Sequence, residues 1–90
     1  MAKLLLAAKL DTSATTELRD ALVAAQDEDV VIDGGAVQMI GGACTELLLS
    51  AAAIWRAAGH GFALENPSSQ MVDDLGTLGL TPDSFLEDAA

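Results

Sequence analysis

Short apolar runs and longer amphipathic stretches alternate along the chain. The runs LLLAA, VVI and FAL are bounded by charged residues or glycine, as is typical of strands in a sheet. They predict strands at residues 3–8, 30–33 and 61–65. Because VVI places three β-branched residues in succession, we expect this strand to be buried on both faces of a parallel sheet.

Three longer segments carry apolar residues at helical spacing. Thr12 or Ser13 can cap the first helix, and Asn66 can cap the third, with Pro67 at its first helical position. The second helix, at about 43–58, is unusually apolar, and Gly59 is placed to end it. The predicted inner stripes are Ala14, Leu18, Ala21, Leu22 and Ala25 in the first helix, and Met71, Leu75 and Leu78 in the third, which Gly79 ends.

This order of elements predicts an α/β fold. Strands that alternate with helices favour a mostly parallel sheet with right-handed crossovers. We expect one small domain over residues 1–90, with about four strands and three to four helices packed against them. Val37 and Ile40 should point inward from the segment before the second helix, and Thr81 and Pro82 should begin one more capped turn.

Charge narrows the function classes. The 90 residues include 14 acidic and four basic side chains, for a net charge of −10, and no lysine or arginine follows Arg56. A nucleic-acid partner needs a basic surface, so none is expected, and any charged partner surface should be basic. The single cysteine fits a reducing compartment, and no apolar stretch reaches the roughly 20 residues of a membrane span. We therefore expect a cytoplasmic protein without membrane insertion.

Residues that could carry chemistry are isolated from one another. His60 and Cys44 are single, so a metal cluster is not expected, and Ser50 and Thr45 have no evident general base. Cys44 at a helix N-terminus could have a lowered pKa, but a small apolar residue there is more often buried and inert. The sequence therefore predicts no catalytic residues, no metal and no cofactor.

Two pairs of glycines flank the segment before the second helix. Gly34-Gly35 and Gly41-Gly42 match neither the phosphate-binding loop nor the dinucleotide fingerprint, so the simplest interpretation is that they allow tight turns. Asp33 ends the buried strand at the sheet edge where α/β proteins place their sites. Its carboxylate either satisfies loop N–H groups or contacts a partner.

Three stretches together resemble the STAS domain family, which includes the anti-sigma-factor antagonists and parts of sulfate transporters. They are LDTSATTELRDAL, VVIDGGAVQMIGGACTELLLSA and GFALENPSSQMVDDLGTLGL, and they cover nearly the whole chain. Asp11, Asp33, Ile40 and 78–80 occupy the positions of the family pattern.

The sequence departs from the family at the turn after Ile40. In the antagonists this turn usually reads Asp-Ser-Ser-Gly, and a partner kinase phosphorylates the first serine. Here the turn has no hydroxyl at the usual serine position, Gly42, so we expect no phosphoacceptor. The resemblance still implies a partner-binding surface at the turn and the start of the helix, made of Asp33, Gly41, Gly42, Ala43, Cys44 and Thr45.

The resemblance implies a non-enzymatic protein–protein interaction module of bacterial signalling. Its partner would be an anti-sigma kinase-like protein or a chemotaxis-related component, and the module would not be switched by serine phosphorylation at the usual site. Two alternatives stay open: an accessory subunit of an ABC-type lipid transporter, and a module that binds a nucleotide or other small ligand. A homodimer is also considered.

Overall fold

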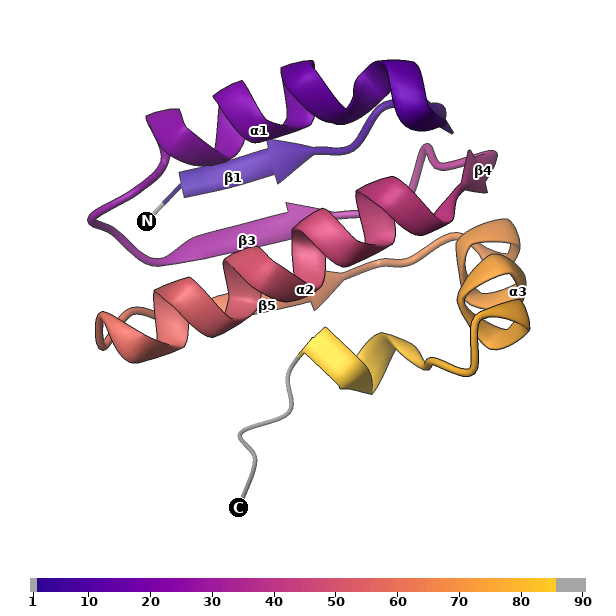
Figure 1. The fold of residues 1–90 in the computed structure, drawn as a ribbon. Helices are drawn as coiled ribbons and strands as arrows, with labels where there is room; N and C mark the ends of the chain where they lie inside the picture. Colours follow the sequence, from indigo (N-terminus) through magenta and orange to yellow (C-terminus); the bar gives the residue numbers. More distant parts are fainter. Residues whose placement is uncertain (1, 86–90) are drawn as a thin grey trace.

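The computed structural model describes residues 2–85 and has the predicted α/β architecture (Figure 1). Strands β1 (Ala2–Leu5), β3 (Val30–Asp33) and β5 (Phe62–Glu65) form a parallel sheet in the order β1-β3-β5. Two shorter strands, β2 (Lys9–Leu10) and β4 (Met39–Ile40), pair in parallel as a separate ladder. The mostly parallel topology is confirmed, although the strands divide between two sheets.

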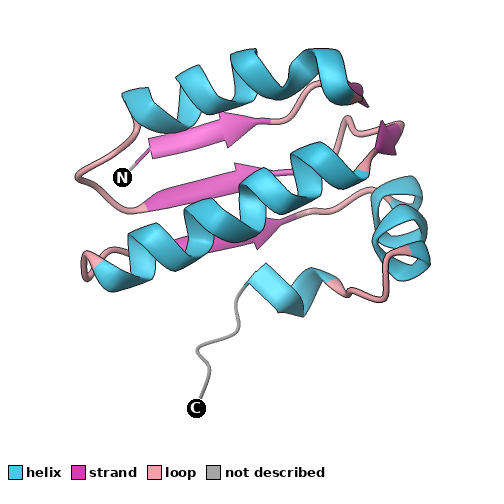
Figure 2. Cartoon of the chain, in the orientation of Figure 1, coloured by secondary structure: helices cyan, strands magenta, loops and turns pink. Residues whose placement is uncertain are grey.

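Helices α1 (Thr15–Ala24) and α2 (Gly42–Ala57) lie side by side over one face of the three-stranded sheet (Figures 1 and 2). A 3-10 turn, η1 (Thr12–Ala14), precedes α1. Helix α3 (Ser69–Thr77) lies beyond the carboxyl ends of the strands, and the 3-10 turn η2 (Pro82–Phe85) packs near β5 and α2. The short β2–β4 ladder lies at the same end of the sheet, where β4 contacts α3.

Burial of the central strand differs from the prediction. Val30 and Ile32 are buried beneath the helices, but Val31 and Asp33 face the opposite side of the sheet and are only partly covered. Right-handed crossovers that step across the sheet in one direction place successive helices on the same face. The expectation that VVI is buried on both faces was therefore wrong, because α1 and α2 cover the same side.

The helix ends also differ in detail from the prediction. Ser68, and not Asn66, caps α3: its Oγ accepts the N–H of Met71 at 3.0 Å, whereas Asn66 adopts a left-handed φ of 50°. Asp11, and not Thr12 or Ser13, caps the turn before α1 by accepting the N–H of Ser13 at 3.1 Å.

Other expectations about the ends and the core are confirmed. Gly59 and Gly79 follow the ends of α2 and α3 with φ of 81° and 78°, a region that favours glycine. Val37 and Ile40 are buried, as are Met71 and Leu75 on the inner face of α3. Leu78 is instead 45% exposed, because α3 ends one residue before it.

Candidate functional site

The turn that leads into α2 is anchored on two sides. The Gly41 N–H donates to the carbonyl of Leu10 at 2.9 Å, which extends the β2–β4 ladder by one bond. The Ile40 N–H donates to Oδ2 of Asp74 in α3, also at 2.9 Å. The start of α2 is therefore fixed relative to both the ladder and α3.

The residues of this turn divide into an exposed pair and a buried pair. Gly42 and Ala43 face solvent at the first turn of α2, while Cys44 and Thr45 point into the protein. The five predicted residues 41–45 thus share one turn, but only its first part offers an exposed contact surface.

Cys44 is fully buried, and its thiol lies 3.4 Å from the carbonyl oxygen of Asp11 as a donor. Burial raises the pKa of the Cys44 thiol above its usual value, and the nearby charge of Asp11 acts in the same direction. The structure therefore supports the buried, inert interpretation and not a thiol with a lowered pKa.

Thr45 is only 2% exposed, and its hydroxyl donates to the carbonyl of Gly41 at 2.9 Å. The same carbonyl accepts the Thr45 N–H at 3.1 Å. Because the hydroxyl is both buried and engaged, the hydroxyl nearest to the turn cannot reach a kinase without opening the helix.

Neither glycine of this turn is required by the packing of the chain itself. Gly41 has a φ of −94°, which any residue can adopt. A Cβ added at Gly42 would meet nothing within 4 Å, and one at Gly41 would lie 3.6 Å from the Leu10 carbonyl, an ordinary contact. The exposed backbone at 41–42 therefore has no explanation within the described residues.

Asp33 belongs to a different network, on the open face of the sheet. Its Oδ1 accepts the N–H of Gly35 at 2.8 Å and lies 3.5 Å from the amide of Asn66, while Lys3 Nζ lies 3.6 Å from Oδ2. The Gly35 hydrogen bond, helped by the charge of Lys3, lowers the pKa of Asp33 below its usual value. These contacts support the interpretation that the Asp33 carboxylate accepts hydrogen bonds from N–H groups of its own loop. None of them involves residues 41–45.

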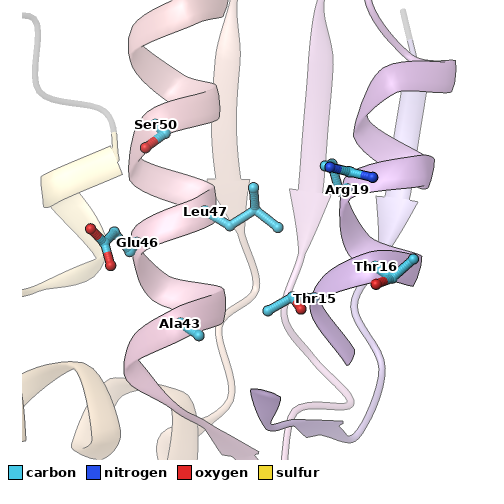
Figure 3. Close-up of a pocket in the computed structure, with 7 residues that line it drawn as sticks. All are labelled: Thr15, Thr16, Arg19, Ala43, Glu46, Leu47 and Ser50. Carbon is cyan, nitrogen blue, oxygen red and sulfur yellow. The ribbon is translucent and has the colours of Figure 1, made fainter. Parts of the chain in front are cut away.

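A groove between α1 and α2 begins beside this turn and was not predicted from the sequence. Its wider part encloses about 400 Å³, and Figure 3 shows Leu47 of α2 pointing toward α1 and Thr15 pointing toward α2. A narrower part of about 160 Å³ continues along both helices and is more apolar. The lining residues are Thr15, Thr16, Arg19, Ala43, Glu46, Leu47 and Ser50 in the wide part, and Arg19, Leu22, Val23, Gln26, Leu47, Ser50, Ala51, Ile54 and Trp55 in the narrow part. We call the two parts together the α1–α2 groove.

One sequence signal could have indicated this groove. Val23 and Ile54 lie outside the buried stripes of their helices and are 53% and 63% exposed. Large apolar side chains on the outer side of two helices suggest a contact surface, but only the fold brings the two helices together.

Within residues 2–85, the potential metal ligands do not gather into a site. No group of three His, Cys, Asp or Glu side chains there could hold a metal ion. His60 lies with Nδ1 3.7 Å from Asp29 Oδ1, next to Gly61, whose N–H donates to the same carboxylate at 2.8 Å.

The family model described as "Mlab, STAS domain" matches residues 2–86. The chain therefore belongs to the STAS domain family, whose members are in general regulatory or binding modules and not enzymes. No curated protein and no solved structure matches the chain. Among the described residues, no helix is long and apolar enough to cross a membrane.

Proposed function

We propose that this protein is a non-enzymatic module that binds and regulates a signalling protein through the turn at residues 41–45. The partner would be an anti-sigma kinase-like protein or a chemotaxis-related component, and the complex would form in the cytoplasm. Membership of the STAS family supports a binding role. The function would not depend on serine phosphorylation, because Gly42 has no hydroxyl.

The exposed backbone of Gly42 is the observation on which this proposal rests. The turn is held at a fixed position by Leu10 and Asp74, yet a side chain at residue 42 would meet nothing in the chain. A bare backbone on a rigid turn allows another surface to approach closely. A partner that packs against this turn explains a glycine that the fold itself does not need.

The test is a calorimetric titration of the partner, obtained by co-purification, with wild type and with Gly42→Asp. The added carboxylate should weaken binding about 5- to 150-fold, because a close-packed surface must either move or bury an unpaired charge. Gly76→Asp is a matched control, since Gly76 is an exposed helical glycine of α3 whose Cβ would also meet nothing within 4 Å. Equal affinities of wild type and Gly42→Asp would move the binding surface elsewhere.

A second candidate function is the alternative that the family resemblance left open. In this alternative, the protein is the STAS accessory subunit of an ABC-type lipid transporter, as in lipid-asymmetry systems. Co-purification separates the two, because the captured protein is a signalling component in one case and an ATPase subunit in the other. A thermal shift with ATP or GTP in the absence of any partner would instead support the nucleotide-binding alternative.

A further inference from the structure

The apolar part of the α1–α2 groove is formed by side chains that no element of the described chain covers. Val23 of α1 and Ile54 of α2 are more than half exposed, and both line the same hollow. Trp55, the single tryptophan, lines this hollow as well and is itself buried. Apolar side chains that converge from two helices favour a partner that removes them from water.

Arg19 lies where the apolar and polar parts of the groove meet, because it lines both. In residues 2–85 its guanidinium has no hydrogen-bond or ion-pair partner, although the chain has 14 acidic residues. Lys3 and Arg56 are engaged, the first with Asp33 and Glu65 and the second with the Phe85 carbonyl at 3.0 Å. An exposed arginine beside an apolar hollow is suited to pair with an incoming carboxylate.

The shape of the groove fits a helix better than a strand. One side is lined from Thr15, at the start of α1, to Gln26, just beyond its end, and the other from Ala43 to Trp55 of α2; the length is about 17 Å or three helical turns. The backbone groups in the middle of two helices are already hydrogen-bonded, so an extended peptide would find no ladder to join. A third helix, in contrast, can pack its side chains between the ridges of two neighbours.

From these observations we infer that the α1–α2 groove binds an amphipathic helix of a partner protein. The apolar side chains of that helix cover Val23 and Ile54, and a carboxylate about one turn away pairs with Arg19. Its remaining surface is basic, because the chain that receives it has a net charge of −10. The inference rests on the proposed function as a protein-binding module and adds a second surface and the chemistry of the segment that occupies it.

The same charge argues against a second copy of this chain as the occupant. Two copies would each have a net charge of −10 and would repel each other at low salt. A partner segment with basic flanks would instead be attracted toward the chain and oriented in the groove by Arg19.

The probes are two synthetic helical peptides of about four turns that differ at one position. Both peptides carry leucines along one face and lysines at the other positions. At one position, about one helical turn beyond the leucines, one peptide has a glutamate and the other has a lysine. Binding to the full 90-residue chain is followed by Trp55 fluorescence and by NMR shifts of backbone amides. We expect saturable shifts at Arg19, Val23 and Ile54, and about three- to tenfold tighter binding of the glutamate peptide.

Charge reversal in the protein makes the test specific. Arg19→Glu should reverse the preference, so that the lysine peptide binds more tightly, and added salt should reduce the preference in both proteins. Because the Arg19 side chain has no partner in the described structure, this variant should stay folded, which far-UV circular dichroism checks. An unchanged preference for the glutamate peptide in Arg19→Glu would contradict the pairing.

Two further variants locate the surface. Ile54→Asp should remove peptide binding, whereas Val72→Asp, on the exposed side of α3 and 40% exposed in the wild type, should leave it unchanged. Shifts centred on α3, or no saturable shift with either peptide, would overturn the inference. A self-associated protein that Ile54→Asp makes monomeric would assign the groove to a second copy and would also overturn it.

The outcome is separable from that of the proposed function. If the cognate partner is sensitive to Gly42→Asp but not to Ile54→Asp, the groove inference fails and the binding role of the turn stands. If Gly42→Asp leaves the affinity for the partner unchanged but the peptides bind the groove as expected, the proposal that the turn binds the partner fails instead.

Discussion

The two glycine pairs of this protein look alike in the sequence but serve different purposes. Gly34 lies under α3, where an added Cβ would be 2.6 Å from Met71 Sδ and 3.3 Å from the Pro67 Cα. A Cβ added at Gly35 would be 2.6 Å from Asn66 Nδ2 and 3.1 Å from Asp33 Oδ1. At Gly42, in contrast, a Cβ would meet nothing within 4 Å.

The first pair is therefore explained by the fold, and the second is not. Close packing of α3 on the loop after β3 requires a residue without a side chain at position 34. No such requirement exists at position 42, where glycine even weakens the helix slightly. Gly76 is likewise not required by the packing, so Gly42 is distinguished by its place in a turn that the Leu10 carbonyl and Asp74 hold in position. For this reason the turn at 41–45 carries the functional proposal.

The largest expected effect comes from Gly34→Ala. The added methyl group would overlap the buried Met71 side chain and press on the backbone at Pro67, so the Met71 side chain or α3 must shift. We expect the free energy of unfolding to fall by about 1–3 kcal/mol, the usual range for overpacking. Urea unfolding followed by Trp55 fluorescence measures this. An unchanged midpoint would mean that α3 is not held closely against the loop and that the two glycine pairs are alike.

A smaller effect is expected from acid, through Asp33 and its loop. The pKa of Asp33 is lowered in the folded protein by the Gly35 N–H and Lys3, and that of Asp11 by Ser13. A group with a lowered folded pKa stabilises the fold above its unfolded pKa, and this contribution is lost as the pH falls through the folded value. Stability should therefore decline below about pH 4.

Asp33→Asn isolates the contribution of Asp33 to this pH dependence of stability. The amide oxygen can still accept the Gly35 N–H, but the side chain no longer titrates. We expect its unfolding midpoint in urea to change less than that of wild type between pH 5 and pH 3, values on either side of the usual aspartate pKa of about 4. Parallel pH profiles would show that the Asp33 charge contributes nothing to the loop. Lost partner binding at unchanged stability would make Asp33 a contact residue instead.

The sequence predicted the order of elements well because that order depends on local patterns. The helix between 43 and 58 and the glycine ends at Gly59 and Gly79 follow from apolar spacing and backbone preference alone. The capping residue of α3 was missed because Asn66 and Ser68 are both good caps within three positions. A tertiary contact, in which Ser68 Oγ donates to the Val37 carbonyl at 2.6 Å, holds Ser68 in the capping position.

The candidate site was predicted only in part, for a related reason. The turn at 41–45 could be found because it departs from a family pattern at defined positions. The open face at Val31 and the α1–α2 groove could not, because they depend on which face of the sheet each crossover covers. Patterns along one helix show that Val23 and Ile54 are apolar, but not that they line one hollow.

The buried side of the turn gives a further test of its rigidity. Cys44 is fully buried with a raised pKa, so its thiol should react much more slowly with a thiol reagent in the native protein than in urea. Rapid modification of the wild type would show that the start of α2 opens readily and would weaken the case for a fixed docking surface.

The smallest expected effect on folding is that of Gly42→Ala, and it has the opposite sign to Gly34→Ala. The added methyl group meets nothing, and alanine restricts the unfolded chain more than glycine does, so stability should rise by about 0.5 kcal/mol. Partner affinity should nevertheless fall severalfold, because the methyl group separates the two surfaces at the bare turn. Thermal unfolding and a titration with the cognate partner measure the two quantities on the same sample. A gain in stability without loss of partner affinity would show that Gly42 is not needed for close approach of the partner. Neither glycine pair would then be connected to function.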